Sequence, residues 1–306
     1  MKMMTAGKIL AFAAAAALAV AAAACRARTP ASGQSAVATI FPVYVTLKEV
    51  AGARVDVRLL VQPGMEAHSF EPRPQDAETA ASSRVFAYAG DVMEPWARNF
   101  ARGLGGGVNI FDMSAGTKLL KPPLSSSSGA AYDPHYWLDF DNAAVMAQNA
   151  QRALSAAFPA DAAYFAANSA GVGKKLSALD AEYKKRLSSC KSRTLIYAGH
   201  FSFGYLAARY NLDYHALGDI SPEAEPSAGK IAALVMAAKA AGAKTVFAEE
   251  MASPRFANLV AAETGASVVV LNPMHEISPA DFAGGADYFS IMETNLDRIA
   301  QGLQCR

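Results

Sequence analysis

Five histidines carry the clearest chemistry in this 306-residue sequence. Four of them come where a loop should follow a predicted strand: His68, His135, His200 and His275. Because ligands bind at the carboxyl ends of strands in open α/β sheets, these loops are expected to share an edge. Imidazoles from both walls of a cleft are typical of a transition-metal site. Taken singly, each histidine is equally well explained as a hydrogen-bonded structural residue, and His215, on a predicted strand, is interpreted in that way.

Short β-branched and aromatic runs alternate with longer helical patterns along most of the chain. Strands separated by helical segments of ten or more residues predict βα units and mainly parallel sheets. The predicted strands are 37–40, 55–61, 85–88 and 108–111 in a first group, and 194–198, 245–248 and 267–271 in a second. The sequence therefore predicts an α/β fold with two mainly parallel-sheet lobes, residues 36–159 and 190–306, and a metal site in the interlobe cleft.

A single long helix over residues 160–189 is predicted to bridge the lobes. Pro159 suits its opening because the missing N–H would have no partner there. Such a helix spans about 45 Å at 1.5 Å per residue, enough to run along both lobes, and it favours small shifts over wide hinge closure. Its apolar positions at helical spacing are Tyr164, Leu176, Leu179, Tyr183 and Leu187.

Residues 1–25 have the pattern of a secretory signal peptide. A positively charged start and an apolar run, Ile9–Ala24, precede Cys25. The run is short and mostly alanine for a hydrocarbon layer about 30 Å thick, which disfavours a retained anchor. Residues 22–25 resemble a bacterial lipobox, so lipidation of Cys25 is favoured over simple release, with residues 26–35 as a linker. We expect an extracytoplasmic protein, either periplasmic or membrane-anchored as a lipoprotein.

Export changes the interpretation of the other two cysteines, Cys190 and Cys305. In an oxidising compartment, two remaining cysteines favour a disulfide over a metal site or a nucleophile. The bridge would pin the C-terminal helix to its own lobe. Two free thiols that never meet are the alternative.

The charge balance argues against one class of partner. The chain has 28 Lys and Arg against 27 Asp and Glu, a formal net charge of +1. Proteins that bind nucleic acid carry a basic patch or a basic excess, and none is found here. We therefore expect no nucleic-acid partner.

Five segments around the histidines form a series that points to a known family. They are GMEAHSFEPRPQD at 64–76, Gly90 with Glu94-Pro95-Trp96, DPHYWLD at 133–139, GHFSFGYL at 199–206, and ISPEAEPS at 220–227. In this order, and from Ala36 to the C-terminus, the chain resembles the metal-binding receptors of ABC importers, the zinc and manganese solute-binding family. The resemblance implies a high-affinity receptor that hands a divalent metal ion to an ABC permease and its ATPase.

The resemblance also implies three metal ligands. His68, His135 and His200 fall on the family's three metal positions. Manganese members often have Glu at the third, whereas this chain has His200. Because three neutral imidazoles favour a borderline-soft ion, zinc is the first choice and manganese the second.

The fourth ligand departs from the family pattern. Many relatives have Asp after the last strand, where this chain has Asn272, a neutral amide. His275 could reach the ion from the same loop and is favoured, with Glu276, Glu249 or water as alternatives. Residues 125–128 lie where many zinc members have a loop rich in His and acidic residues, so accessory zinc capture by that loop is not expected.

Two other functions fit parts of this pattern. A manganese-specific receptor or an adhesin of the same family would use the same site. Three His ligands with an open position also describe a catalytic zinc, with Glu249, Glu250 or Glu276 as general base. Ligands scattered over two lobes, without an HExxH motif, suit capture and release better than hydrolysis. We therefore expect stoichiometric metal binding rather than catalysis, with affinity falling as the pH drops through about 6.5.

Overall fold

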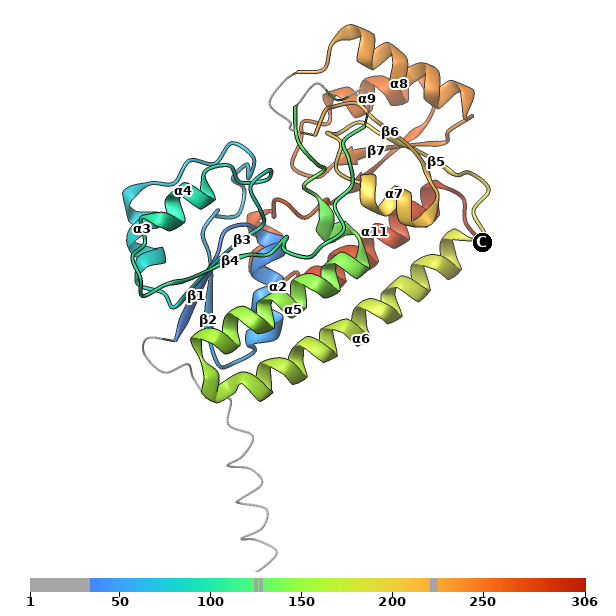
Figure 1. The fold of residues 1–306 in the computed structure, drawn as a ribbon. Coiled ribbons are helices and arrows are strands. Elements are labelled where there is room, and N and C mark those ends of the chain that lie inside the picture. Colours follow the sequence, from blue (N-terminus) through green and yellow to red (C-terminus); the bar gives the residue numbers. More distant parts are fainter. Residues whose placement is uncertain (1–33, 124–125, 127–128, 221–224) are drawn as a thin grey trace, which may run out of the picture.

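The computed structural model describes residues 34–123, 126, 129–220 and 225–306 (Figure 1). The expected signal peptide with Cys25 lies outside the described residues, as do the linker up to residue 33 and most of the serine run 125–128. The predictions for these segments stay predictions. Within the described ranges, no helix is both long enough and apolar enough to cross a membrane.

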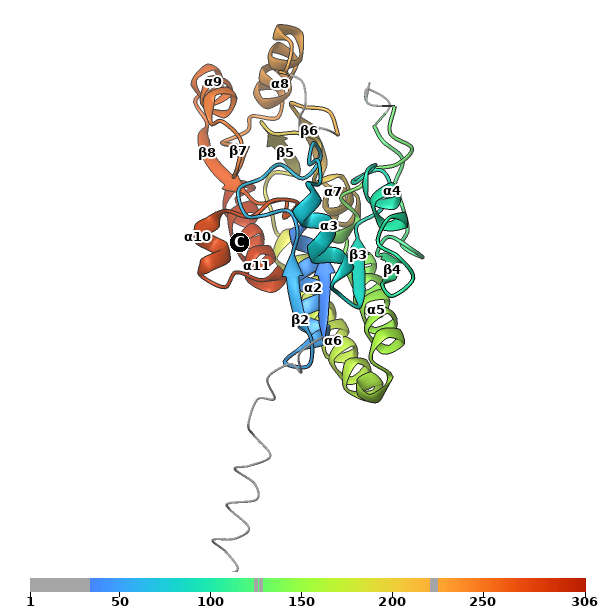
Figure 2. The same cartoon turned by 90° about the vertical axis from the view of Figure 1, so that its left-hand side faces the viewer.

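Two parallel sheets of four strands each form the centres of two lobes (Figures 1 and 2). The first has the order β2-β1-β3-β4 and consists of β1 (Ser35–Ala38), β2 (Asp56–Leu59), β3 (Val85–Tyr88) and β4 (Asn109–Asp112). The second has the order β6-β5-β7-β8 and consists of β5 (Thr194–Tyr197), β6 (Asp213–Ala216), β7 (Thr245–Glu249) and β8 (Ser267–Leu271). The predicted α/β class with two mainly parallel-sheet lobes is confirmed.

The central strands explain why the sheets are parallel. Every residue of β1, β3 and β7 is buried. Continuous apolar runs of this kind are typical of strands covered by helices on both faces. The covering helices are α2 (Phe41–Ala51), α3 (Pro74–Ala81), α4 (Ala97–Arg102), α7 (Gly204–Tyr210), α8 (Ala228–Ala240), α9 (Arg255–Thr264) and α10 (Pro279–Ala283). Strand order changes direction between β1 and β3 and between β5 and β7, so a crevice forms at each carboxyl edge.

Three long helices lie along both lobes: α5 (Phe140–Ala157), α6 (Ala162–Leu187) and α11 (Tyr288–Gly302) (Figure 1). The bridging helix α6 begins two residues later than predicted because Pro159 opens a short 3-10 turn, Pro159–Asp161. Its 26 residues span about 39 Å. Helices α5 and α11 both pack against α6, and the Tyr183 hydroxyl donates to the Met292 carbonyl at 2.6 Å. The bridge is therefore a layer of helices rather than one isolated rod.

The hydrophobic core also joins the lobes. One cluster of buried side chains runs from the first sheet through α5, α6 and α11 to residues of the second lobe such as Leu271 and Met274. A separate, smaller cluster lies between the second sheet and helices α8 and α9. Because interiors are close-packed, a shared core of this kind resists rotation of one lobe against the other.

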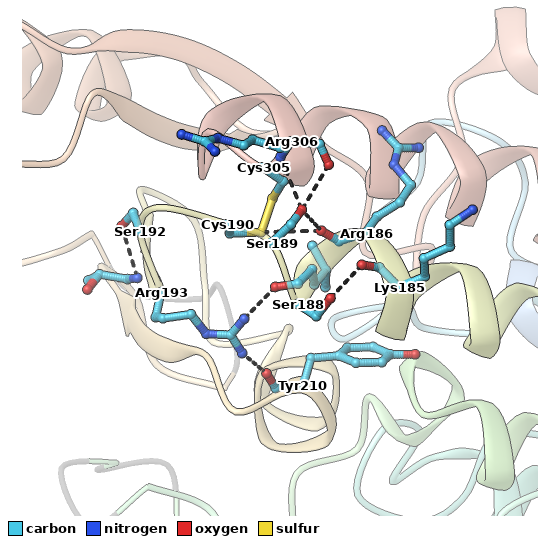
Figure 3. The surroundings of a disulfide bond; sticks show 12 residues. Lys185, Arg186, Ser188, Ser189, Cys190, Ser192, Arg193, Tyr210, Cys305 and Arg306 are labelled. Atoms are coloured by element: carbon cyan, nitrogen blue, oxygen red, sulfur yellow. Dashed lines mark hydrogen bonds between the residues drawn. A yellow bond between two sulfur atoms is a disulfide. The ribbon is translucent and has the colours of Figure 1, made fainter.

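A disulfide joins Cys190 to Cys305, the pair expected from the sequence (Figure 3). It links the segment after α6 to the segment after α11. Hydrogen bonds reinforce it, because the Ser189 hydroxyl donates to the Arg306 carbonyl at 2.9 Å and the Ser192 N–H to the Leu303 carbonyl at 3.1 Å. The C-terminal helix is thereby held at the end of α6 as well as against its own lobe.

Candidate metal centre

Four of the five histidines converge between the carboxyl edges of the two sheets. Their ring centroids are separated by 4.8 Å for His200 and His275, 5.0 Å for His135 and His200, and 5.5 Å for His68 and His200. One nitrogen from each of His68, His135 and His200 lies within 4.8 Å of the others. The fifth, His215, is on β6 and contacts Asp213, apart from this group. The structure thus brings His68, His135 and His200 within reach of one ion, and His275 within reach of an ion shared with His200 or with His68.

Three of the four histidines follow a strand, and the fourth precedes a 3-10 turn. His68 follows β2, His200 follows β5 and His275 follows β8, whereas His135 precedes a 3-10 turn, Tyr136–Leu138, that leads into α5. The His68 loop is fixed to the opposite lobe, because the Gly64 N–H donates to the Ile277 carbonyl at 2.9 Å.

The rings of His135 and His200 each have a carboxylate hydrogen-bonded to Nδ1. This contact turns the Nε2 atom of each ring toward the centre of the histidine group. Asp133 accepts hydrogen bonds from the His135 backbone N–H at 3.0 Å and from its Nδ1 at 2.8 Å. Glu249 does the same for His200, at 3.1 and 2.8 Å. Metal-binding histidines are commonly held by a carboxylate in this way, which fixes the tautomer and leaves Nε2 free to coordinate.

The spacing of these Nε2 atoms suits a tetrahedral metal ion. The Nε2 atoms of His135 and His200 lie 3.1 Å apart. Two imidazoles bound to zinc at about 2.05 Å, with a tetrahedral angle between them, would have nitrogens about 3.3 Å apart. The pair therefore needs almost no rearrangement to hold an ion.

Other ring nitrogens lack any hydrogen-bond partner among the described residues: His68 Nε2, His275 Nδ1 and His275 Nε2. All three are buried. A buried polar atom without a partner costs free energy of about 1 to 3 kcal/mol. A metal ion between these rings would supply the missing partner, so the residues present fit a bound ion.

The protonation states also favour metal binding. Burial, together with the neighbouring imidazoles, holds the pKa values of His68 and His135 well below 6.5 and lowers the pKa of His275 to about 4. Neutral imidazoles are the form that coordinates metal. Burial also acts to lower the pKa of His200, but the Glu249 carboxylate outweighs it and raises that pKa. Three of the four rings are therefore neutral at pH 7 without a metal ion.

Two further carboxylates, Glu66 and Glu276, lie half-buried beside the rings. Burial and a hydrogen bond with Glu276 raise the pKa of Glu66 to about 7. Glu66 can also share an ion with His68 and His275, because one ligand atom from each lies within 4.8 Å of the others. Sequence reasoning missed Glu66 as a ligand, although its place two residues before His68 was a usable signal.

Asn272 is engaged in the turn that follows β8. Its Oδ1 accepts the Met274 N–H at 2.7 Å, and its amide donates to Glu250. Met274 has a φ of 70°, a left-handed conformation uncommon outside glycine. Asn272 therefore stabilises the turn that places His275, and its amide is already occupied by these bonds.

Contacts across the cleft hold the His135 loop in place. The Tyr205 hydroxyl, from α7, donates to the Asp133 carbonyl at 2.7 Å, and the Trp137 indole donates to the Pro273 carbonyl at 2.9 Å. A Cβ atom at Gly204 would lie 2.7 Å from Asp133 Oδ2, so α7 can approach this closely only with glycine there. Trp137 is fully buried as part of the cleft wall.

Comparisons with known proteins identify the family of the chain. The family described as "Zinc-uptake complex component A periplasmic" matches residues 36–302. The zinc-binding protein AdcA of Streptococcus pyogenes serotype M6 is 33% identical over 282 residues, covering 86% of this chain and 55% of AdcA. The chain therefore spans about half the length of AdcA and of similar curated relatives.

Solved structures show the same fold. The laminin-binding protein Lmb of Streptococcus agalactiae, described as a bifunctional protein with adhesin and metal transporting activity, superposes with a TM-score of 0.80 at 31% identity, covering 89% of this chain and all of Lmb. The Zn(II)-bound ZnuA-like domain of Streptococcus pneumoniae AdcA gives a TM-score of 0.76 at 32% identity, covering 89% of this chain and 99% of the domain.

Proposed function

Because the chain belongs to the zinc-uptake complex component A family of periplasmic proteins, we propose that it is an extracytoplasmic receptor that binds one zinc ion and delivers it to an ABC permease and its ATPase. The observation that carries the proposal is the pair of carboxylate-backed Nε2 atoms of His135 and His200, 3.1 Å apart. A membrane anchor at Cys25 would keep the receptor near the permease.

The ligands we propose are His68, His135 and His200, with His275 as the fourth. Nitrogen ligands in a tetrahedral arrangement suit zinc, whereas manganese favours carboxylate and water oxygens in octahedral sites. The carboxylates of Asp133 and Glu249 are engaged with ring nitrogens, which supports zinc over manganese as the cargo.

Metal analysis tests this function directly. Protein purified without added metal should contain one zinc ion per chain, and competitive titration should give tighter binding of zinc than of manganese. Retention of manganese in preference to zinc, or no bound metal after incubation with either ion, would contradict the proposal.

A zinc-dependent hydrolase is the competing function, and we propose that the protein is not one. Glu249, which could act as a general base, is hydrogen-bonded to His200 through Oε2. Hydrolase substrates offered to the zinc-loaded protein should show no turnover.

A third function, adhesion, would use the same site, and Lmb is described as having it. Loss of growth at low zinc on deletion would favour the importer.

The His275→Ala variant tests the fourth ligand. Water can take the vacant position, so we expect zinc affinity to fall by about 100-fold, about 2.7 kcal/mol. Competitive titration against a chelator of known affinity measures the change. An affinity equal to that of the wild type would remove His275 from the site.

The Glu249→Gln variant tests the support behind His200. A glutamine oxygen can still accept from His200 Nδ1 but carries no charge, so zinc affinity should fall by about 10- to 100-fold. Glu250→Gln is the matched control, because Glu250 is the next residue yet contacts Asn272 instead of a histidine. Equal effects of the two substitutions would show that Glu249 has no special relation to the metal.

Among the four rings, only His200 should contribute a proton to the pH dependence of binding near neutral pH. His200 is the one ring of the four whose pKa is raised, so below that pKa an incoming ion must displace one proton. Lower pH favours the protonated ring and therefore weakens binding. Below the pKa of His200, a plot of log Kd against pH should have a slope of about minus one until the pH nears the pKa of His275, about 4. Titrations in a series of buffers measure this slope, and a slope of minus three near pH 6 would contradict it.

A further inference from the structure

Three overlapping sets of ligand atoms lie among the side chains around the cleft. One consists of His200, Glu249 and His275, and the other two share His68. The first of these two, which we call the inner set, consists of His68, His135 and His200. The second, the capture set, consists of Glu66, His68 and His275. In each set, one ligand atom from every member lies within 4.8 Å of the others.

The inner set and the capture set differ in depth. His135 is completely buried, and His200 and His275 are each 3% exposed, whereas Glu66 and the shared His68 are partly open to solvent. An ion that arrives from solution therefore meets Glu66 and His68 before it can reach His135.

The capture set also has the ligand atoms that lack other partners. His68 Nε2 and both ring nitrogens of His275 are buried without a hydrogen-bond partner in the described part of the chain. Glu66 uses its Oε1 atom to accept the His68 N–H at 2.8 Å, which fixes its carboxylate beside the ring. These groups are held in place before the ion arrives.

We propose that the capture set is a transient zinc site through which the ion enters and leaves the inner set. This inference rests on the proposed function. A hydrated zinc ion is costly to strip of water, and a Glu66 oxygen together with the His68 and His275 nitrogens replaces part of that water. His68 and His275 stay bound throughout, while His135 and His200 replace Glu66 and the remaining waters. No bond other than metal–ligand bonds forms or breaks.

This role gives a distinctive kinetic result. A side chain that coordinates the zinc ion only while the ion moves in or out lowers the free energy of the transition state but not that of the final complex. It therefore accelerates entry and exit by the same factor. Loss of Glu66 should therefore lower the association and dissociation rate constants by the same factor, about tenfold, and leave Kd unchanged.

The test uses stopped-flow zinc binding to the full chain, and dissociation into an excess of chelator, for Glu66→Gln and Glu276→Gln. Both variants remove one carboxylate from the same pair at the mouth of the site. A glutamine at 66 can still accept the His68 N–H. Glu276 lies 3.5 Å from His275 Nε2 and shares a hydrogen bond with Glu66, but it belongs to none of the ligand sets. Its variant therefore shows the effect of losing the neighbouring carboxylate while every member of the capture set is kept. We expect both rate constants to fall only in Glu66→Gln.

Three results would overturn the proposal. If the two variants changed the rate constants equally and high salt removed the change, Glu66 would act only by general electrostatic attraction of the ion. A weaker Kd with faster dissociation would make Glu66 a ligand of the final complex. Unchanged rates in Glu66→Gln would exclude any role in passage. Failure of the wild type to bind zinc would instead overturn the proposed function, so the two failures are distinguishable.

Discussion

Replacing His135 with alanine should weaken zinc binding by at least about a thousandfold, about 4.1 kcal/mol. His135 is completely buried, and its Nε2 lies 3.1 Å from that of His200. The substitution removes one of three inner ligands and also leaves Asp133, which is only 1% exposed, without its ring partner. Water can replace the nitrogen but not the ring that seals the site.

Competitive zinc titration measures this loss, and His215→Ala is the control. His215 is a histidine of the second sheet that contacts Asp213 and lies apart from the other four. Its variant should bind zinc as the wild type does. The thermal shift gives a second readout, because zinc at a thousand times Kd stabilises the wild-type fold by about 4 kcal/mol. An affinity of His135→Ala within tenfold of the wild type would place the ion elsewhere.

The convergence of the histidines could be predicted because topology enforces it. In a parallel sheet every loop after a strand emerges at the same edge, so His68, His200 and His275 had to lie near the cleft once the strands were identified. Strand identity itself followed from the apolar runs, and the bounds of β3 and β8 agree with prediction. The sequence therefore allowed us to predict which histidines lie together in the site.

The supporting contacts could not be predicted in the same way. Helix α5 begins after Asp139, whose side chain caps it by accepting the Asp141 and Asn142 N–H groups, a local signal that the sequence does contain. Its packing against α6 depends on alanines and other small residues, which carry no pattern that specifies a partner. Asn272 stabilises its turn because Met274 has a positive φ, and a methionine in the sequence does not indicate that conformation.

Ion pairs between distant segments are the hardest contacts to predict. Arg209 in α7 donates to Asp139 and Asp141 at the start of α5 and to Asp180 in α6, at distances of 2.8 to 2.9 Å for its shortest bond to each. These residues are far apart in sequence and share no motif. The cluster joins the helix after His200 to the helix after His135, and so connects the two walls of the cleft.

Replacing Arg209 with methionine should therefore destabilise the fold by about 3 to 5 kcal/mol, the usual cost of removing one partner from a buried ion pair. The Arg209 side chain is only 12% exposed, and so is that of Asp180, which would keep its charge. Urea denaturation of the metal-free protein measures the loss. Arg98→Met is the control, because Arg98 pairs with Asp91 at the surface and should cost less than about 1 kcal/mol.

The cost of Arg209→Met should also depend on pH. Burial acts to raise the pKa of Asp180, but hydrogen bonds from Arg209, Lys184 and Tyr210 outweigh it and lower that pKa well below its usual range. Because the folded-state pKa lies below the unfolded value of about 3.9, ionised Asp180 stabilises the fold above that pH, and the stabilisation is lost as the pH falls. The difference in unfolding free energy between wild type and variant should thus be constant from pH 5 to 7 and shrink below about pH 4. A difference that stays constant into acid would mean that Arg209 acts by packing against Phe140 rather than by its charge.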